Sequence, residues 1–98
     1  MQVQMSAAGF KEWLETRQPT AIVGYARDMC NCPIARYYTD LSGMQRSIMP
    51  DKSIPWLYAF IVAVDKHPTG TRITAAEALE ILAQGLTSYN LFRIIIAQ

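Results

Sequence analysis

The residues with the most chemical potential are Cys30-Asn31-Cys32-Pro33, where reactive side chains crowd together in a 98-residue chain that has two cysteines and one histidine. The chemistry that such a cluster can perform is attack by a thiolate. Cys32 is the better candidate, because a helix is expected to begin at Pro33 and the positive end of its dipole would lower the thiol pKa. A buried structural role at a helix junction remains the more common use of cysteine.

A metal site is a weaker interpretation of the same region. Cys30, Cys32 and the single histidine, His67, supply three ligands, whereas a structural zinc site usually shows two clear ligand pairs. His67 lies between Lys66 and Pro68 in a polar loop, where no sequence neighbour would orient it as a general base. We therefore predict no metal ion, no cofactor and no catalytic residue, and expect the chain not to be an enzyme.

Composition excludes several classes of partner. The net charge is +1, from nine Lys and Arg against eight Asp and Glu without charge runs, which gives no electrostatic footprint for nucleic acid or an anionic membrane. The longest uncharged apolar run, Ile54 to Val64, is shorter than the roughly 20 residues that span a bilayer. No secretory signal is visible, and free thiols fit a reducing compartment, so we expect a cytoplasmic protein. Met1 and Met5 both remain candidates for the native start.

Short helices on both sides must position the cysteine cluster. Ser6 is a cap for a first helix that reaches Arg17, before Gln18-Pro19 breaks the pattern. A second helix is expected over Thr20–Cys30, in which Gly24 is explained by a close approach of another helix or by irregularity. A third helix is expected over Pro33–Leu41, with Gly43 suited to its left-handed end.

Later elements follow from caps and apolar runs. Residues 56–64 are apolar all round, so periodicity does not separate helix from strand, although the Ser-x-Pro start favours a helix. Thr74 and Glu77 have the spacing of a capping box, which predicts a strong helix over Ala75–Gln84. The last segment, Tyr89–Ala97, is compatible with a helix or a strand.

Together these elements predict one compact helical domain over residues 1–98, an all-α bundle of five to six short helices packed around residues 56–64. Residues 1–5 are expected to fray, as terminal segments commonly do. A minor two-stranded hairpin that pairs residues 46–49 with residues 71–73 stays open as an addition to the bundle.

The favoured function is a non-catalytic protein–protein interaction module. A hydrophobic fraction of 51% is generous for the thin core of so short a chain, which leaves apolar surface for a partner. One expected partner is a second copy of the same chain, because a helix or strand at the carboxyl end would be apolar on both faces. We predict a homodimer whose dimerisation segment is residues 86–98. Its expected interface residues are Leu91, Phe92, Ile94, Ile95 and Ile96.

Two other functions stay open. Residues 75–96 have the outline of a helix-turn-helix, which would make the chain a DNA-binding regulator, but Arg93 is the only cation in the second helix. A nucleic-acid partner is therefore disfavoured. The other alternative is a small thiol enzyme that uses Cys32. The partner's identity, the pathway and any small ligand do not follow from the sequence.

Overall fold

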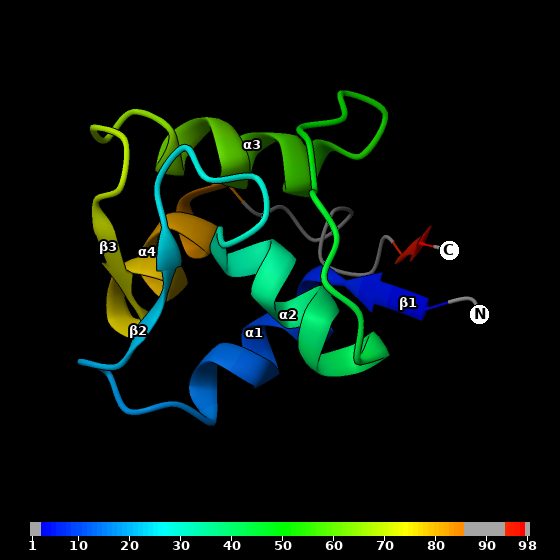
Figure 1. Cartoon of the computed structure of the whole chain (residues 1–98), viewed down its shortest axis with the longest axis horizontal. Coiled ribbons are helices and arrows are strands. Elements are labelled where there is room, and N and C mark those ends of the chain that lie inside the picture. The colour runs from blue at the N-terminus through cyan, green and yellow to red at the C-terminus, as the bar shows by residue number, and fades with distance from the viewer. Residues whose placement is uncertain (1–2, 86–93, 98) are drawn as a thin grey trace.

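The computed structural model describes residues 3–85 and 94–97 of the chain (Figure 1). Within these residues the chain forms four helices and two separate two-stranded antiparallel sheets, so the predicted all-α bundle of five to six helices is wrong. The elements in chain order are β1 (Val3–Ser6), α1 (Ala7–Glu15), β2 (Ile22–Tyr25), α2 (Pro33–Ser42), α3 (Pro55–Val64), β3 (Arg72–Thr74), α4 (Ala75–Gly85) and β4 (Ile94–Ala97).

The predicted second helix over Thr20–Cys30 is the main error. Its centre forms β2, which pairs with β3 so that Ile22 lies opposite Thr74 and Tyr25 lies opposite Arg72. The β-branched and aromatic residues of this segment favour a strand, and they outweigh the weak helical periodicity once a partner strand is present. The partner in the predicted hairpin is also wrong, because the strand near residues 71–73 pairs with β2 and not with residues 46–49.

Gly24 is required by a close approach of the backbone. A Cβ atom at this position would lie 2.5 Å from the backbone nitrogen of Pro33 and 2.7 Å from the carbonyl oxygen of Asn31. Of the two explanations offered for Gly24, a close approach of another segment is therefore the one that the structure contains. It is made by β2 to the turn that precedes α2, and not by one helix to another.

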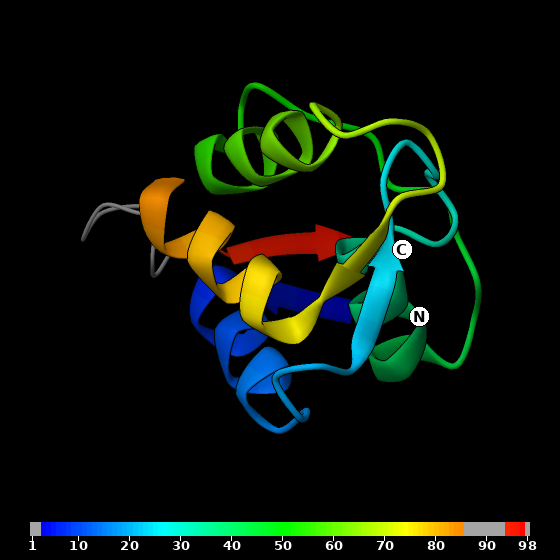
Figure 2. The ribbon, with the colours of Figure 1, turned by 90° about the vertical axis from the view of Figure 1, so that its left-hand side faces the viewer.

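The second sheet joins the two ends of the described chain. β1 pairs with β4 in antiparallel register, with Val3 opposite Ala97 and Ser6 opposite Ile94, and Figure 2 shows the two strands side by side in the middle of the view. Residues 1–2 lie outside the described residues, and the rest of the segment expected to fray belongs to β1. In the segment left open between helix and strand, residues 94–97 form a strand.

The core is an aromatic cluster centred on Phe10 of α1. Its ring centroid lies 5.1 Å from that of Phe60, 5.5 Å from that of Tyr37 and 6.1 Å from that of Trp56. Residues 55–64 form a helix, as the Ser-x-Pro start predicted, and they place Trp56 and Phe60 in this cluster. None of the helices in the described ranges is long and apolar enough to cross a membrane.

The helix starts predicted at Ser6, Pro33 and Thr74 are confirmed. The Ser6 hydroxyl accepts the Gly9 amide at 3.0 Å, and the Thr74 hydroxyl accepts the Glu77 amide at 3.2 Å. α2 begins at Pro33 and ends at Gly43, whose φ of 74° is the left-handed conformation that glycine adopts without strain. These local signals position α1, α2 and α4, and α1 and α2 build the site described next.

Candidate functional site

The surface between α1, β2 and α2 contains a half-open hollow with a volume of about 520 Å³. We call it the α1–α2 hollow. Its walls are formed by Trp13, Arg17, Ala21, Ile22, Val23, Cys30, Asn31, Arg36, Thr39, Asp40 and Gln45. Three of these side chains carry a charge, and two arginines against one aspartate leave an excess of one positive charge.

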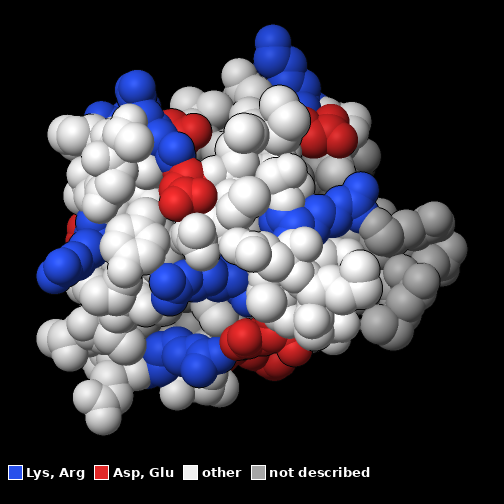
Figure 3. All heavy atoms as spheres, in the orientation of Figure 1, with Lys and Arg blue, Asp and Glu red and all other residues white. Residues whose placement is uncertain are grey.

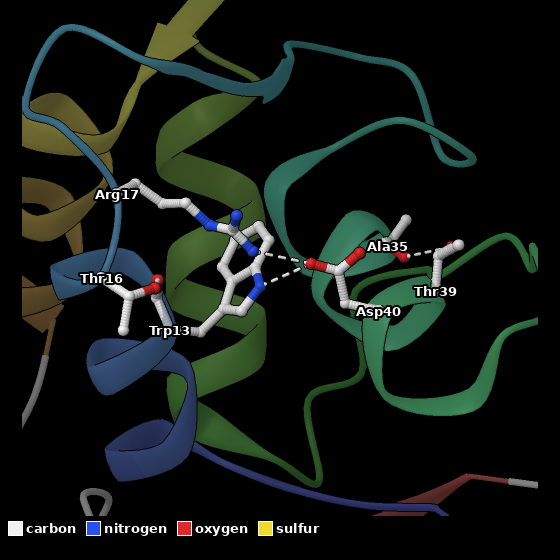
Figure 4. A network of polar contacts seen from close by, with 6 residues as sticks. All are labelled: Trp13, Thr16, Arg17, Ala35, Thr39 and Asp40. Atoms are coloured by element: carbon white, nitrogen blue, oxygen red, sulfur yellow. Dashed lines mark hydrogen bonds and ion pairs between the residues drawn. The ribbon is translucent and has the colours of Figure 1, made fainter.

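One wall is held by a shared carboxylate (Figure 4). Oδ2 of Asp40 accepts a hydrogen bond from Nε1 of Trp13 at 2.7 Å and another from Nη2 of Arg17, also at 2.7 Å. The Arg17 guanidinium in turn lies 4.6 Å from the centre of the Trp13 ring, within cation–π range. Each of the three side chains therefore restricts the other two, although the Arg17 and Asp40 side chains are 40% and 53% exposed.

The helices explain why these groups meet. Trp13 lies in the last turn of α1, and Arg17 follows in the turn just after the helix ends at Glu15, where its amide donates to the Leu14 carbonyl oxygen at 3.1 Å. The Trp13 ring stacks on Phe10 at 6.0 Å and lies 5.6 Å from Tyr37 of α2, which anchors its inner edge in the core. Asp40 comes from the last turn of α2, one turn beyond Tyr37. The wall is thus the outer edge of the packing between α1 and α2.

A second arginine borders the hollow from the first turns of α2. The Arg36 guanidinium lies 5.3 Å from the centre of the Tyr25 ring, which comes from β2. Unlike Arg17, Arg36 has no side-chain hydrogen bond and no ion pair with any other residue that the structure describes. It is half-buried, so its charge is less screened by solvent than that of a fully exposed arginine.

The turn before α2 uses its own backbone amides. The Asp28 carboxylate accepts the amides of Cys30 at 3.1 Å and Asn31 at 3.2 Å, and also the side-chain amide of Asn31 at 3.3 Å. Asp28 therefore fixes the turn that carries both cysteines. Because these backbone donors are occupied, Arg17 and Arg36 provide the positively charged donors of the hollow.

The two cysteines have opposite environments. Cys30 is exposed on the wall of the hollow, whereas Cys32 is 6% exposed and its Sγ accepts the Ala35 amide at 3.4 Å. Cys32 is the N-cap of α2, the helix that was predicted to begin at Pro33. Burial is the largest influence on its thiol and raises the pKa, the backbone amides of Ala35 and Ile34 lower it less, and nearby aspartates raise it slightly. The position therefore works against the reactive thiolate that the helix dipole suggested.

The other predicted sites are not brought into this hollow. Within residues 3–85 and 94–97, no three side chains of His, Cys, Asp or Glu are grouped so that they could hold a metal ion. Of the predicted dimer interface, Leu91 and Phe92 lie outside the described residues, and Ile94, Ile95 and Ile96 belong to β4. The helix-turn-helix outline over residues 75–96 is not formed as predicted, because residues 94–96 of its second helix belong to the strand β4.

A smaller hollow of about 250 Å³ lies on the other side of the cysteine turn. Its charged groups are already engaged: Nε of Arg27 donates to the Asp65 carbonyl oxygen at 2.9 Å, and the Arg27 amide donates to Asp65 Oδ1 at 3.0 Å. These contacts hold Arg27 at a φ of 56°, in the left-handed region. The Arg27 and Asp65 side chains of this smaller hollow thus each hydrogen-bond to the backbone of the other residue, whereas the Arg36 side chain has no hydrogen bond within the described residues.

Four residues of the hollow were not predicted from the sequence: Trp13, Arg17, Arg36 and Asp40. The four-residue spacing of Trp13 and Arg17 was the one available signal, because it predicts a cation over a ring on a helix. Nothing local linked that pair to Asp40. Comparisons with known protein families, with curated proteins and with solved structures found no match to this chain. A function must therefore be inferred from the residues of the site.

Proposed function

We propose that this chain is a non-catalytic protein-binding module and that the α1–α2 hollow holds part of its partner. The observation that carries the proposal is the network of Trp13, Arg17 and Asp40, in which an exposed arginine and a half-buried tryptophan share one carboxylate oxygen. Tryptophan and arginine are enriched among the residues that dominate binding energy at protein interfaces.

Pre-organisation is the physical reason why this network supports binding. A partner that orders a free arginine loses roughly 0.5–1.5 kcal/mol for each immobilised side chain. Arg17 is already held by Asp40 at 2.7 Å and by the face of Trp13 at 4.6 Å, so less of that cost remains when a partner arrives. The network does little for folding, because exposed ion pairs contribute about 0–1 kcal/mol.

The groups in the hollow favour binding over catalysis. The Asp40 oxygen that faces Trp13 and Arg17 already accepts two hydrogen bonds, which makes it a poor general base. Cys30 is the accessible thiol of the wall, and no described hydrogen bond links it to a base that would activate it. Two free cysteines also fit a reducing compartment, and we place the protein in the cytoplasm on that ground.

A comparative capture experiment tests this function. Thr39→Met fills the hollow with a larger uncharged side chain on α2, and Glu80→Met introduces the same side chain on the exposed surface of α4. From extract of the native cell, we expect the parent chain and Glu80→Met to retain one specific protein that Thr39→Met loses. Equal capture by all three chains, or capture of no protein in stoichiometric amount, contradicts the proposal.

Self-association is a second candidate, favoured by the sheet edge. In the described part of the chain, β4 pairs with β1 alone, so its outer edge can accept a strand from a second copy. A homodimer through residues 86–98 would use this edge together with Leu91 and Phe92. Sedimentation of the parent chain and of Ile95→Asp tests it: we expect a dimer that the substitution dissociates, and a monomeric parent chain rules the dimer out.

A further inference from the structure

Arg36 presents a positive charge that the described part of the protein leaves uncompensated. The guanidinium has five N–H donors in a planar fork. Its described contact is with the face of the Tyr25 ring at 5.3 Å, which does not neutralise its charge as a carboxylate would. Asp40, the one acidic residue that lines the hollow, accepts hydrogen bonds from Trp13 and Arg17 instead. Arg36 is therefore positioned by the Tyr25 ring but has no acidic partner among the described residues, and it lies at the wall of a hollow with excess positive charge.

From this arrangement we infer that the α1–α2 hollow binds an acidic segment of a protein partner, with a carboxylate of that segment paired to Arg36. The inference rests on the proposed function and adds the chemistry of the partner. A carboxylate matches the guanidinium fork through two parallel hydrogen bonds, and such charge-assisted pairs are stronger than neutral ones. Stacking on Tyr25 restricts the fork before the partner arrives, which lowers the entropic cost of pairing.

An acidic peptide fits the charge better than a nucleic acid does. Binding along a nucleic-acid backbone requires several arginines or lysines that follow successive phosphates. Within the described residues the hollow has one arginine without an acidic partner, and the net charge of the chain is +1. On the face shown in Figure 3, basic side chains are separated by uncharged surface and by acidic side chains, and they do not form a continuous stripe.

Cys30 provides a direct probe of occupancy. It is exposed on the wall of the hollow, whereas Cys32 is buried, so a thiol reagent at neutral pH modifies Cys30 first. The test uses the full chain and a blocked hexapeptide of alternating glutamate and glycine, with the matching glutamine peptide as control. We expect the glutamate peptide to slow alkylation of Cys30, and calorimetry to show at least about tenfold weaker binding of the glutamine peptide.

Three substitutions locate the contact. Arg36→Gln should weaken binding of the glutamate peptide about tenfold, and Arg36→Lys should give an intermediate affinity because it keeps the charge without the planar fork. Lys52→Gln is the matched control: it also removes one positive charge and a contact with a ring, that of Tyr58 at 5.9 Å, but Lys52 lines neither hollow. Its affinity should equal that of the parent chain.

The outcomes separate this inference from the proposed function. Equal affinity for the two peptides, no binding of either, or equal losses in Arg36→Gln and Lys52→Gln overturns the acidic partner. Stronger competition by single-stranded oligonucleotide than by the glutamate peptide also overturns it. If capture of the native partner still depends on Thr39 in any of these cases, the binding module stands and only the chemistry of its partner is wrong.

Discussion

The inner and outer sides of the packing between α1 and α2 are built by different means. Inside, Phe10 and Tyr37 pack in a closed aromatic cluster with Phe60 and Trp56. Outside, Trp13 is held by a shared carboxylate and a stacked cation on a surface open to solvent. Stability should therefore depend on the inner side and binding on the outer side.

The largest loss of stability is expected from the inner side. Phe60 is 2% exposed and makes an edge-to-face contact with Phe10, so Phe60→Ala removes a buried ring and should lower the free energy of unfolding by about 3–5 kcal/mol. Val62→Ala, on the exposed side of the same helix, should cost less than about 1 kcal/mol. Urea denaturation measures both. A loss below about 1 kcal/mol for Phe60→Ala would place this helix outside the core.

The next-largest loss of stability should come from the junction between β2 and α2, which lies beside the hollow. In Gly24→Ala the new methyl group would lie 2.5 Å from the Pro33 nitrogen. The backbone of β2 would have to move away from that of Pro33, which should lower the free energy of unfolding by about 1–3 kcal/mol. Gly43→Ala meets no atom within 4 Å but has a φ of 74°, so its cost of about 1 kcal/mol is conformational alone. If thermal unfolding shows that Gly24→Ala destabilises the chain less than Gly43→Ala does, the close approach of Gly24 to Pro33 is wrong.

On the outer side, the change in stability should be small. Arg17→Gln and Asp40→Asn break an ion pair whose side chains are 40% and 53% exposed, and each should cost less than about 1 kcal/mol. The fluorescence of Trp13 should nevertheless change in Asp40→Asn, because the indole loses a charged acceptor at 2.7 Å. Losses above about 2 kcal/mol would mean that the network supports the fold, and the separation between the two sides would fail.

The smallest effect at neutral pH concerns the two thiols. Because burial raises the pKa of Cys32, the folded chain keeps this proton at pH values where the unfolded chain has lost it. Stability from this thiol is complete below its ordinary pKa of 9.0 and is lost as the pH rises above that value. Cys32→Ala should remove this step, and Cys30→Ala should retain it. Burial also raises the pKa of Tyr37, from an ordinary 10.0, so a later alkaline step remains in both variants.

The sequence predicted those parts of the fold that depend on near neighbours. The caps at Ser6 and Thr74 each use a hydroxyl and an amide three residues apart, and Pro33 restricts its own φ. The same local logic placed Cys32 at a helix start. It could not show that the thiol is buried, and burial reversed the expected direction of its pKa.

The parts that escaped prediction depend on distant partners. Residues 22–25 become a strand because residues 72–74 pair with them, and no local pattern contains that partner. Asp40 is 27 residues from Trp13 and 23 from Arg17, so the hollow arises only when α1 and α2 pack. The strand β1 was also missed, since an isolated short strand has no stability without its partner.

The pairing of β1 with β4 sets an order of events during synthesis on the ribosome. Chains emerge from the amino end, and contacts between distant residues form late because a long loop must close first. Residues 3–6 therefore gain their strand partner only after nearly all of the described chain has been made. Until then the backbone groups of β1 that pair with β4 stay accessible to chaperones even if α1 has already formed.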